Sequence, residues 1–112
     1  MTLKEVIERL GLHVLTSKEV GDAKVTGGYT CDLLSNVMAN CKTGDLWITM
    51  QTHQNVLAVV KLKDLAGIVF VNGRQPDEEV IQKANEEHIT VLRTDESAFS
   101  ISGQLYQLLK EP

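Results

Sequence analysis

Five residues that could contact a small anionic ligand follow two apolar runs of the chain, at the points where those runs end. They are Thr52, His53, Asn72, Gly73 and Arg74. Their hydroxyl, imidazole, amide and guanidinium groups donate hydrogen bonds of the kind that phosphate and carboxylate oxygens accept. Gly73 has no side chain, so it would let the backbone approach a ligand closely. The pattern predicts a binding site rather than a catalytic set.

The start of a predicted helix near Gln54 favours the same place. The segment Gln51–Asn55 contains no acidic residue, and free backbone N–H groups at a helix start can bind an anion. Arg74 and Arg93 would add positive charge from neighbouring loops. A helix predicted to begin near Pro76 is a poorer host, because acidic residues occupy its start. The alternatives, a solvated loop edge or a protein contact, stay open on sequence alone.

The sequence contains no recognised catalytic or metal-binding motif. No Walker motif, Gly-x-Gly-x-x-Gly or Gly-x-Ser-x-Gly is present. His53 follows a predicted strand whereas His88 precedes one, and in a parallel sheet these positions lie at opposite edges. Because metal ligands must converge on one ion, we expect no metal site, and we expect no catalytic residue and no cofactor.

Three apolar runs position the candidate residues: Leu46–Thr49, Gly67–Val71 and Ile89–Leu92. Each is followed by a stretch with helical periodicity, and strands that alternate with helices favour βαβ units. We expect the three strands to be parallel neighbours in one sheet. Ligand sites in such sheets lie past the carboxyl ends of the strands. The prediction is a small α/β domain with a mainly parallel sheet, in two or three layers.

Local signals predict the remaining elements. Thr2 and Glu5 have the spacing of a capping box, and Leu12–Leu15 is expected to form a short strand. Val25–Thr30 contains paired glycines, which indicate a turn or a close approach of two backbones. Thr94 is placed to cap the last helix. The expected helices cover Asp32–Asn40, Val56–Leu62, the residues after Pro76, and the last turns around Ile101, Leu105, Leu108 and Leu109.

The chain of 112 residues is one domain by length. Its net charge of −4 and scattered basic residues argue against nucleic-acid binding. No apolar run approaches the ~20 residues that span a bilayer, and residues 1–10 are unlike a signal peptide. Cys31 and Cys41 would lie about 15 Å apart along a predicted helix, beyond disulfide reach. We therefore expect reduced thiols and a cytoplasmic location, with no membrane partner.

Three segments resemble the DRTGG domain family: Gly44–Thr49, Gly67–Gly73 and Pro76-Asp77. The resemblance covers roughly Val25 to Leu109. It implies a fold similar to the amino-terminal domain of HPr kinase/phosphorylase. The same domain occurs in some phosphotransacetylases, beside CBS domains in some pyrophosphatases, and in stand-alone bacterial proteins. The whole chain, residues 1–112, is expected to be a single DRTGG-like domain.

The family signature is degenerate in this chain. In the family an Asp-Arg pair follows the first of these strands and Thr-Gly-Gly follows the second. The aligned residues here are Thr52-His53 and Val71-Asn72-Gly73, so only Gly73 matches. Thr26-Gly27-Gly28 has similar letters but precedes a different element.

The resemblance implies a non-catalytic regulatory or accessory domain that self-associates and binds a partner protein or small ligand. We expect a two-fold dimer, the commonest soluble assembly. The helices over Val56–Leu62 and Leu33–Met38 carry more apolar surface than we expect a small sheet to cover. The alternative is a sensor that binds a nucleotide or phosphorylated metabolite at the strand carboxyl ends. A phosphotransferase-type enzyme is a distant third.

Overall fold

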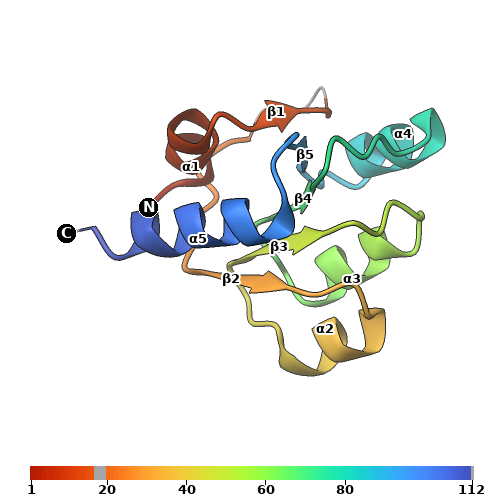
Figure 1. Cartoon of the computed structure of the whole chain (residues 1–112). Helices are drawn as coiled ribbons and strands as arrows, with labels where there is room; N and C mark the ends of the chain where they lie inside the picture. The colour runs from red at the N-terminus through yellow and green to blue at the C-terminus, as the bar shows by residue number, and fades with distance from the viewer. Residues whose placement is uncertain (17–19, 112) are drawn as a thin grey trace.

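A computed structural model describes residues 1–16 and 20–111 of the chain (Figure 1). Helices and strands follow one another along most of its length. In chain order they are α1 (Leu3–Leu10), β1 (His13–Val14), β2 (Gly27–Thr30), α2 (Leu34–Asn40), β3 (Asp45–Thr49), α3 (Val56–Leu62), β4 (Gly67–Phe70), α4 (Glu78–Glu86), β5 (Val91–Arg93) and α5 (Ala98–Leu109).

The strands form one five-stranded sheet in the order β1-β5-β4-β3-β2. Strands β2, β3, β4 and β5 are parallel to one another, and the short β1 pairs antiparallel with β5. The three strands predicted as parallel neighbours are β3, β4 and β5, so that prediction is confirmed. Their carboxyl ends lie at one edge, where Thr49 is aligned with Phe70 and Phe70 with Arg93.

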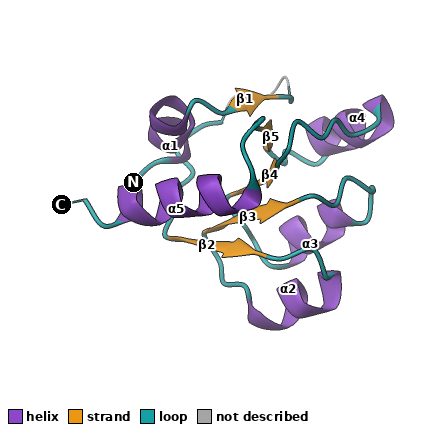
Figure 2. Ribbon diagram, in the orientation of Figure 1, coloured by secondary structure: helices purple, strands orange, loops and turns teal. Residues whose placement is uncertain are grey.

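Helices cover both faces of the sheet, which makes three layers (Figure 2). Side chains alternate between the two faces along each strand. Trp47 packs into a core formed with α2, α3 and α4, whereas its neighbours Leu46 and Ile48 pack into a second core formed with α1 and α5. Both faces are therefore buried, and this explains why the strands appear in the sequence as continuous apolar runs.

The segment with paired glycines is a strand rather than the expected turn, and the close neighbours of its glycines are side chains rather than a second backbone. Gly27 and Gly28 pair with β3 as part of the edge strand β2. A Cβ added at Gly27 would lie 2.6 Å from Asp45 Oδ1, and one added at Gly28 would lie 2.7 Å from Leu105 Cδ2. A side chain at either position would therefore require the Asp45 or the Leu105 side chain to shift, and tertiary contact overrides the low strand propensity of glycine.

The helix starts agree with the sequence in part. Thr2 and Glu5 form the predicted capping box on α1. The cap of α5 is Ser97, whose hydroxyl accepts from Ser100 N, and not Thr94 as predicted. The Thr94 hydroxyl instead accepts from Glu96 N in the loop before the helix. Pro76 precedes α4, which begins at Glu78 with Asp77 at its N-cap.

Most apolar residues of the two apolar helices are covered within one protomer. In α3 the residues Val56, Leu57, Val59 and Val60 are buried, and in α2 Val37 is buried. Leu62 and Leu33 remain exposed, at 73% and 64%. The sheet therefore covers most of the apolar surface of these helices but leaves Leu33 and Leu62 uncovered. The dimer itself stays a prediction.

Candidate functional site

The five candidate ligand contacts lie in two adjacent loops at the carboxyl edge of the sheet. Thr52 and His53 follow β3, and Asn72, Gly73 and Arg74 follow β4. His53, Asn72 and Arg74 are exposed, while Thr52 and Gly73 are half-buried. The Asn72 amide donates to Met50 Sδ at 3.0 Å, which joins the two loops.

The β4–α4 loop donates its backbone N–H groups to the protein itself. Asn72 and Gly73 both have positive φ, at 58° and 66°. Asn72 N donates to Glu96 O and Gly73 N donates to Thr94 O, each at 2.9 Å. A Cβ on Gly73 would lie 3.0 Å from Asp95 Oδ1. Gly73 therefore allows the β4–α4 loop to pack closely against the β5–α5 loop. The N–H groups of Asn72 and Gly73 already have acceptors within the protein.

The β3–α3 loop is also fixed by internal hydrogen bonds. Asp32 Oδ1 accepts from the Thr49 hydroxyl at 2.7 Å and from Met50 N at 2.8 Å. His53 Nδ1 accepts from Asn55 N at 3.1 Å, just before α3 begins. Helix α3 has only seven residues. The imidazole therefore orders the entry to a short helix, with Nε2 left for another partner.

Arg93 brings a guanidinium to the same edge, as predicted. It ends β5, and its Nη1 donates to Gln75 Oε1 at 3.1 Å. Its Nη2 lies 3.8 Å from Asp95 Oδ1. Its Nε is buried and has no hydrogen-bond partner among residues 1–16 and 20–111. Positive charge at the strand ends is thus held close to the sheet.

The hollow that includes His53 does not join the two loops. It has a volume of about 670 Å³ and opens between α3 and α4; it is lined by His53, Gln54, Asn55, Ala58, Lys61, Leu62, Lys83 and Glu87. His88 lies in the loop before β5, at the amino edge of the sheet, as the sequence predicted. In the part of the chain that the structure describes, no three His, Cys, Asp or Glu side chains gather to hold a metal ion.

A second surface was not predicted from the sequence. A hollow of about 430 Å³, here called the β2–α5 hollow, lies between the edge strand and the last helix. Its lining residues are Thr26, Gly27, Gly28, Thr30, Ile48, Ser102, Leu105, Tyr106, Leu109 and Lys110. Tyr106 lines this hollow and is 62% exposed, whereas Phe99, 91% exposed, lines a hollow on the other side of α5. The sequence signal for an exposed aromatic surface was the seven-residue spacing of Phe99 and Tyr106. This spacing places both on the side of α5 opposite Ile101, Leu105 and Leu108.

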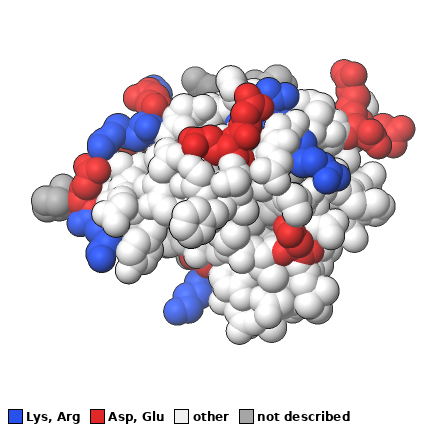
Figure 3. All heavy atoms as spheres, viewed as in Figure 1, with Lys and Arg blue, Asp and Glu red and all other residues white. Residues whose placement is uncertain are grey.

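The charges around α5 lie at its two ends. At the start, the Gln104 and Ser100 side chains donate to Glu96 and hold its pKa below the ordinary value. At the far end, Lys110 Nζ lies over the Tyr106 ring, 4.8 Å from its centre. In the view of Figure 3, the surface between these ends is largely uncharged over α5 and β2.

A profile of the DRTGG domain family matches residues 5–108, so the chain belongs to that family. DRTGG domains are regulatory, which confirms the regulatory or accessory role expected from the resemblance. No curated protein matches by sequence. Among matching solved structures is that of the CBS and DRTGG domains of the regulatory region of Clostridium perfringens pyrophosphatase, complexed with its activator diadenosine tetraphosphate. The identity is 18% and the TM-score is 0.76, over 95% of this chain and 46% of that one. The chain therefore has the same fold and spans about half of that solved chain.

The structure also bears on the cysteines and on membrane insertion. Cys41 is buried and Cys31 half-buried, and both are free thiols. None of the helices within the described ranges has the length and apolar character required to cross a bilayer.

Proposed function

We propose that this chain is a non-catalytic, cytoplasmic regulatory domain that acts by pairing with a second copy of itself. One observation carries the proposal: Phe99 and Tyr106 expose 91% and 62% of their surface on the side of α5 that faces away from the sheet. Aromatic side chains dominate the energetics of protein interfaces. Apart from Lys110, which lies over the Tyr106 ring, the surface around them is largely uncharged, so both are costly to leave in water and a partner surface would cover them.

The absence of catalysis rests on how the polar groups at the strand ends are used. The Thr49 hydroxyl and His53 Nδ1 are both engaged in hydrogen bonds that order their own loops. A general base needs a nucleophile or substrate proton within hydrogen-bond reach, whereas the partner of His53 Nδ1 is a backbone N–H. The free thiols agree with the cytoplasmic location, where cysteines stay reduced.

Sedimentation equilibrium across the micromolar range tests self-association. We expect a species of twice the 12.4 kDa protomer mass that dissociates on dilution. Phe99→Ser should move that dissociation to higher concentration without changing the circular dichroism spectrum, because the side chain is exposed. A 12.4 kDa species at every concentration would contradict the proposal.

A second candidate function is binding of a small anionic ligand at the strand carboxyl ends, through Thr52, His53, Asn72, Gly73 and Arg74. Two observations favour it: Arg93 holds a guanidinium at this edge with its Nε unpaired among the described atoms, and the pyrophosphatase region of the same fold was solved with a nucleotide activator. The exposed Arg74 could reach the same ligand, and His53 Nε2 could donate to it.

Thermal-shift measurements with ATP, diadenosine tetraphosphate and acetyl phosphate test this candidate. A ligand at 100 times its Kd should stabilise the fold by about 2.7 kcal/mol. Both His53→Ala and Arg74→Ala should reduce that shift, while Lys24→Ala, which changes an exposed charge near the amino edge, should leave it intact. An equal shift in all four proteins would place the ligand elsewhere.

A further inference from the structure

One stripe of α5 forms the helix side of the β2–α5 hollow. The helix residues that line the hollow are Ser102, Leu105, Tyr106, Leu109 and Lys110. Steps of three, one, three and one positions put all of them on one side of the helix. Helix α5 lies along β2 and runs in the opposite direction (Figure 1). The stripe extends about 12 Å along the helix at its rise per residue, so the hollow suits an extended ligand.

The two ends of the hollow differ in chemistry. At one end the Thr30 and Ser102 hydroxyls lie 2.7 Å apart and form a hydrogen bond with each other. At the other end is Lys110, whose Nζ lies over the Tyr106 ring, 4.8 Å from its centre. Within residues 1–16 and 20–111, Lys110 forms no ion pair and no acidic side chain lines the hollow. The Lys110 ammonium group can therefore bind an anion.

The wall between these two ends is apolar. Ile48 and Leu105 are almost fully buried, Leu109 is half-buried, and the Tyr106 ring adds an exposed aromatic surface. Gly28 adds no side chain on the strand side, where a Cβ would lie 2.7 Å from Leu105 Cδ2. Small-molecule sites are concave, mostly apolar and carry few polar groups, with volumes of about 300–1,000 Å³. The hollow, at about 430 Å³, matches that description.

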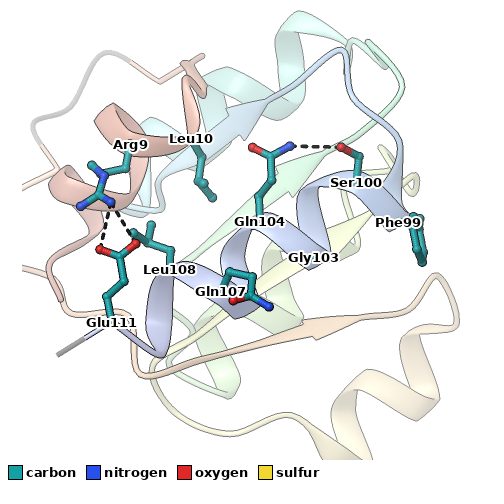
Figure 4. Close-up of a pocket in the computed structure, with 9 residues that line it drawn as sticks. All are labelled: Arg9, Leu10, Phe99, Ser100, Gly103, Gln104, Gln107, Leu108 and Glu111. Carbon is teal, nitrogen blue, oxygen red and sulfur yellow. Dashed lines mark hydrogen bonds and ion pairs between the residues drawn. The ribbon is translucent and has the colours of Figure 1, made fainter.

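The hollow on the other side of α5 does not have an unpaired cation. It measures about 570 Å³, lies between α5 and α1, and has Arg9 as its only basic lining residue. Figure 4 shows the Arg9 guanidinium facing the Glu111 carboxylate, and the two form an ion pair at 3.0 Å. This pair neutralises the cation of that hollow. It also engages Glu111, the acidic residue that follows Lys110 in the chain.

From these observations we propose that the β2–α5 hollow binds a small organic acid with an extended apolar body. The apolar body lies along Ile48, Leu105 and Leu109 and contacts the Tyr106 ring. The carboxylate pairs with Lys110 Nζ. Removal of apolar surface from water drives the binding, and the charged contact selects an acid over a neutral molecule of the same shape. The site is separate from the loops at the strand carboxyl ends, and the inference does not depend on pairing of two copies.

Isothermal titration calorimetry with octanoate tests the site. Octanoate combines a linear apolar chain with a carboxylate, whereas octanol has the chain without the charge and acetate has the charge without the chain. Octanoate should bind at one site per protomer, and both other compounds should bind at least tenfold more weakly, about 1.4 kcal/mol. Octanol that binds as tightly as octanoate would overturn the proposal, as would the absence of saturable binding at millimolar octanoate.

Two variants with matched controls locate the acid. Lys110→Gln should weaken octanoate binding at least tenfold and leave octanol binding unchanged, because only the charged contact is lost. Lys61→Gln removes an exposed charge from α3, on the opposite face of the sheet, and should change neither. Tyr106→Ser should weaken binding of both compounds, because it removes part of the apolar wall. Phe99→Ser, which changes the hollow on the other side of α5, should weaken neither.

Circular dichroism checks that each variant folds. An octanoate affinity that stays at the wild-type value in both Lys110→Gln and Tyr106→Ser would put the acid at another place on the protein and overturn the assignment of the β2–α5 hollow.

Discussion

Replacing either of two glycines by alanine should change stability in opposite directions, although both have free space around them. A Cβ at Gly103 or at Gly11 would meet no described atom within 4 Å. The two differ in backbone conformation. Gly103 lies inside α5, whereas Gly11 ends α1 with a φ of 65°. Sterics alone would predict no difference, so the pair isolates the effect of φ.

The magnitudes follow from those conformations. Gly103→Ala should raise the free energy of unfolding by roughly 0.8–1 kcal/mol, the difference in helix propensity. Gly11→Ala should lower it by about 1–2 kcal/mol, the cost of a left-handed conformation for a residue with a Cβ. For a domain of this size the two midpoints of thermal unfolding should then separate by roughly 10 °C.

Urea titrations followed by far-ultraviolet circular dichroism measure both changes. They should be made at the lowest usable concentration, because pairing adds concentration-dependent stability to the folded state. If Gly103→Ala is destabilising, then the surroundings of Gly103 within the protomer are not as open as described. If Gly11→Ala is neutral, the cap of α1 does not require its left-handed conformation.

Three further outcomes are expected. Trp47→Phe removes the indole bond to Cys31 O, 2.8 Å long, and opens a void; it should cost about 2–3 kcal/mol in urea titration, and a loss within error would contradict that bond. The Thr2 backbone and hydroxyl hold the pKa of Glu5 below its ordinary value, so α1 helicity should fall as pH drops through the acid range, and Glu5→Gln should flatten that titration. Burial raises the pKa of Cys41, so iodoacetamide at mildly alkaline pH should modify Cys31 first; mass spectrometry that finds Cys41 labelled first would refute this.

The central strands could be predicted from the sequence because their own residues show that they are buried. Strands β3 and β4 are buried on both faces, and continuous apolar runs between helical stretches are typical of such strands. Strand β2 could not be predicted in this way. Its glycines carry no side-chain pattern, and the reason for them lies in contacts with Asp45 and Leu105, which are distant in the sequence.

The five candidate residues lie at the carboxyl edge of β3 and β4, where the sequence placed them, and their role in binding stays a prediction. Which of the site's hydrogen-bonding groups already have partners within the protein could not be predicted. The acceptors for Asn72 N and Gly73 N come from the loop after β5, and nothing in the residues of the β4–α4 loop indicates them. Likewise Ser97 and Thr94 both have hydroxyls near the start of α5, and only the fold decides that Ser97 caps the helix.

The bonds that fix the β4–α4 loop also connect the sheet edge to α5. Asn72 N donates to the Glu96 backbone oxygen and Gly73 N to the Thr94 backbone oxygen. The Glu96 carboxylate accepts hydrogen bonds from Ser100 and Gln104 on the helix. A ligand that displaced Asn72 and Gly73 would therefore break their hydrogen bonds to residues 94–96 and disturb the start of α5. Ligand binding and pairing would then be thermodynamically linked, each changing the affinity of the other by the same factor. A ligand able to loosen that segment would separate the two copies, and separation of the copies would tighten its binding equally.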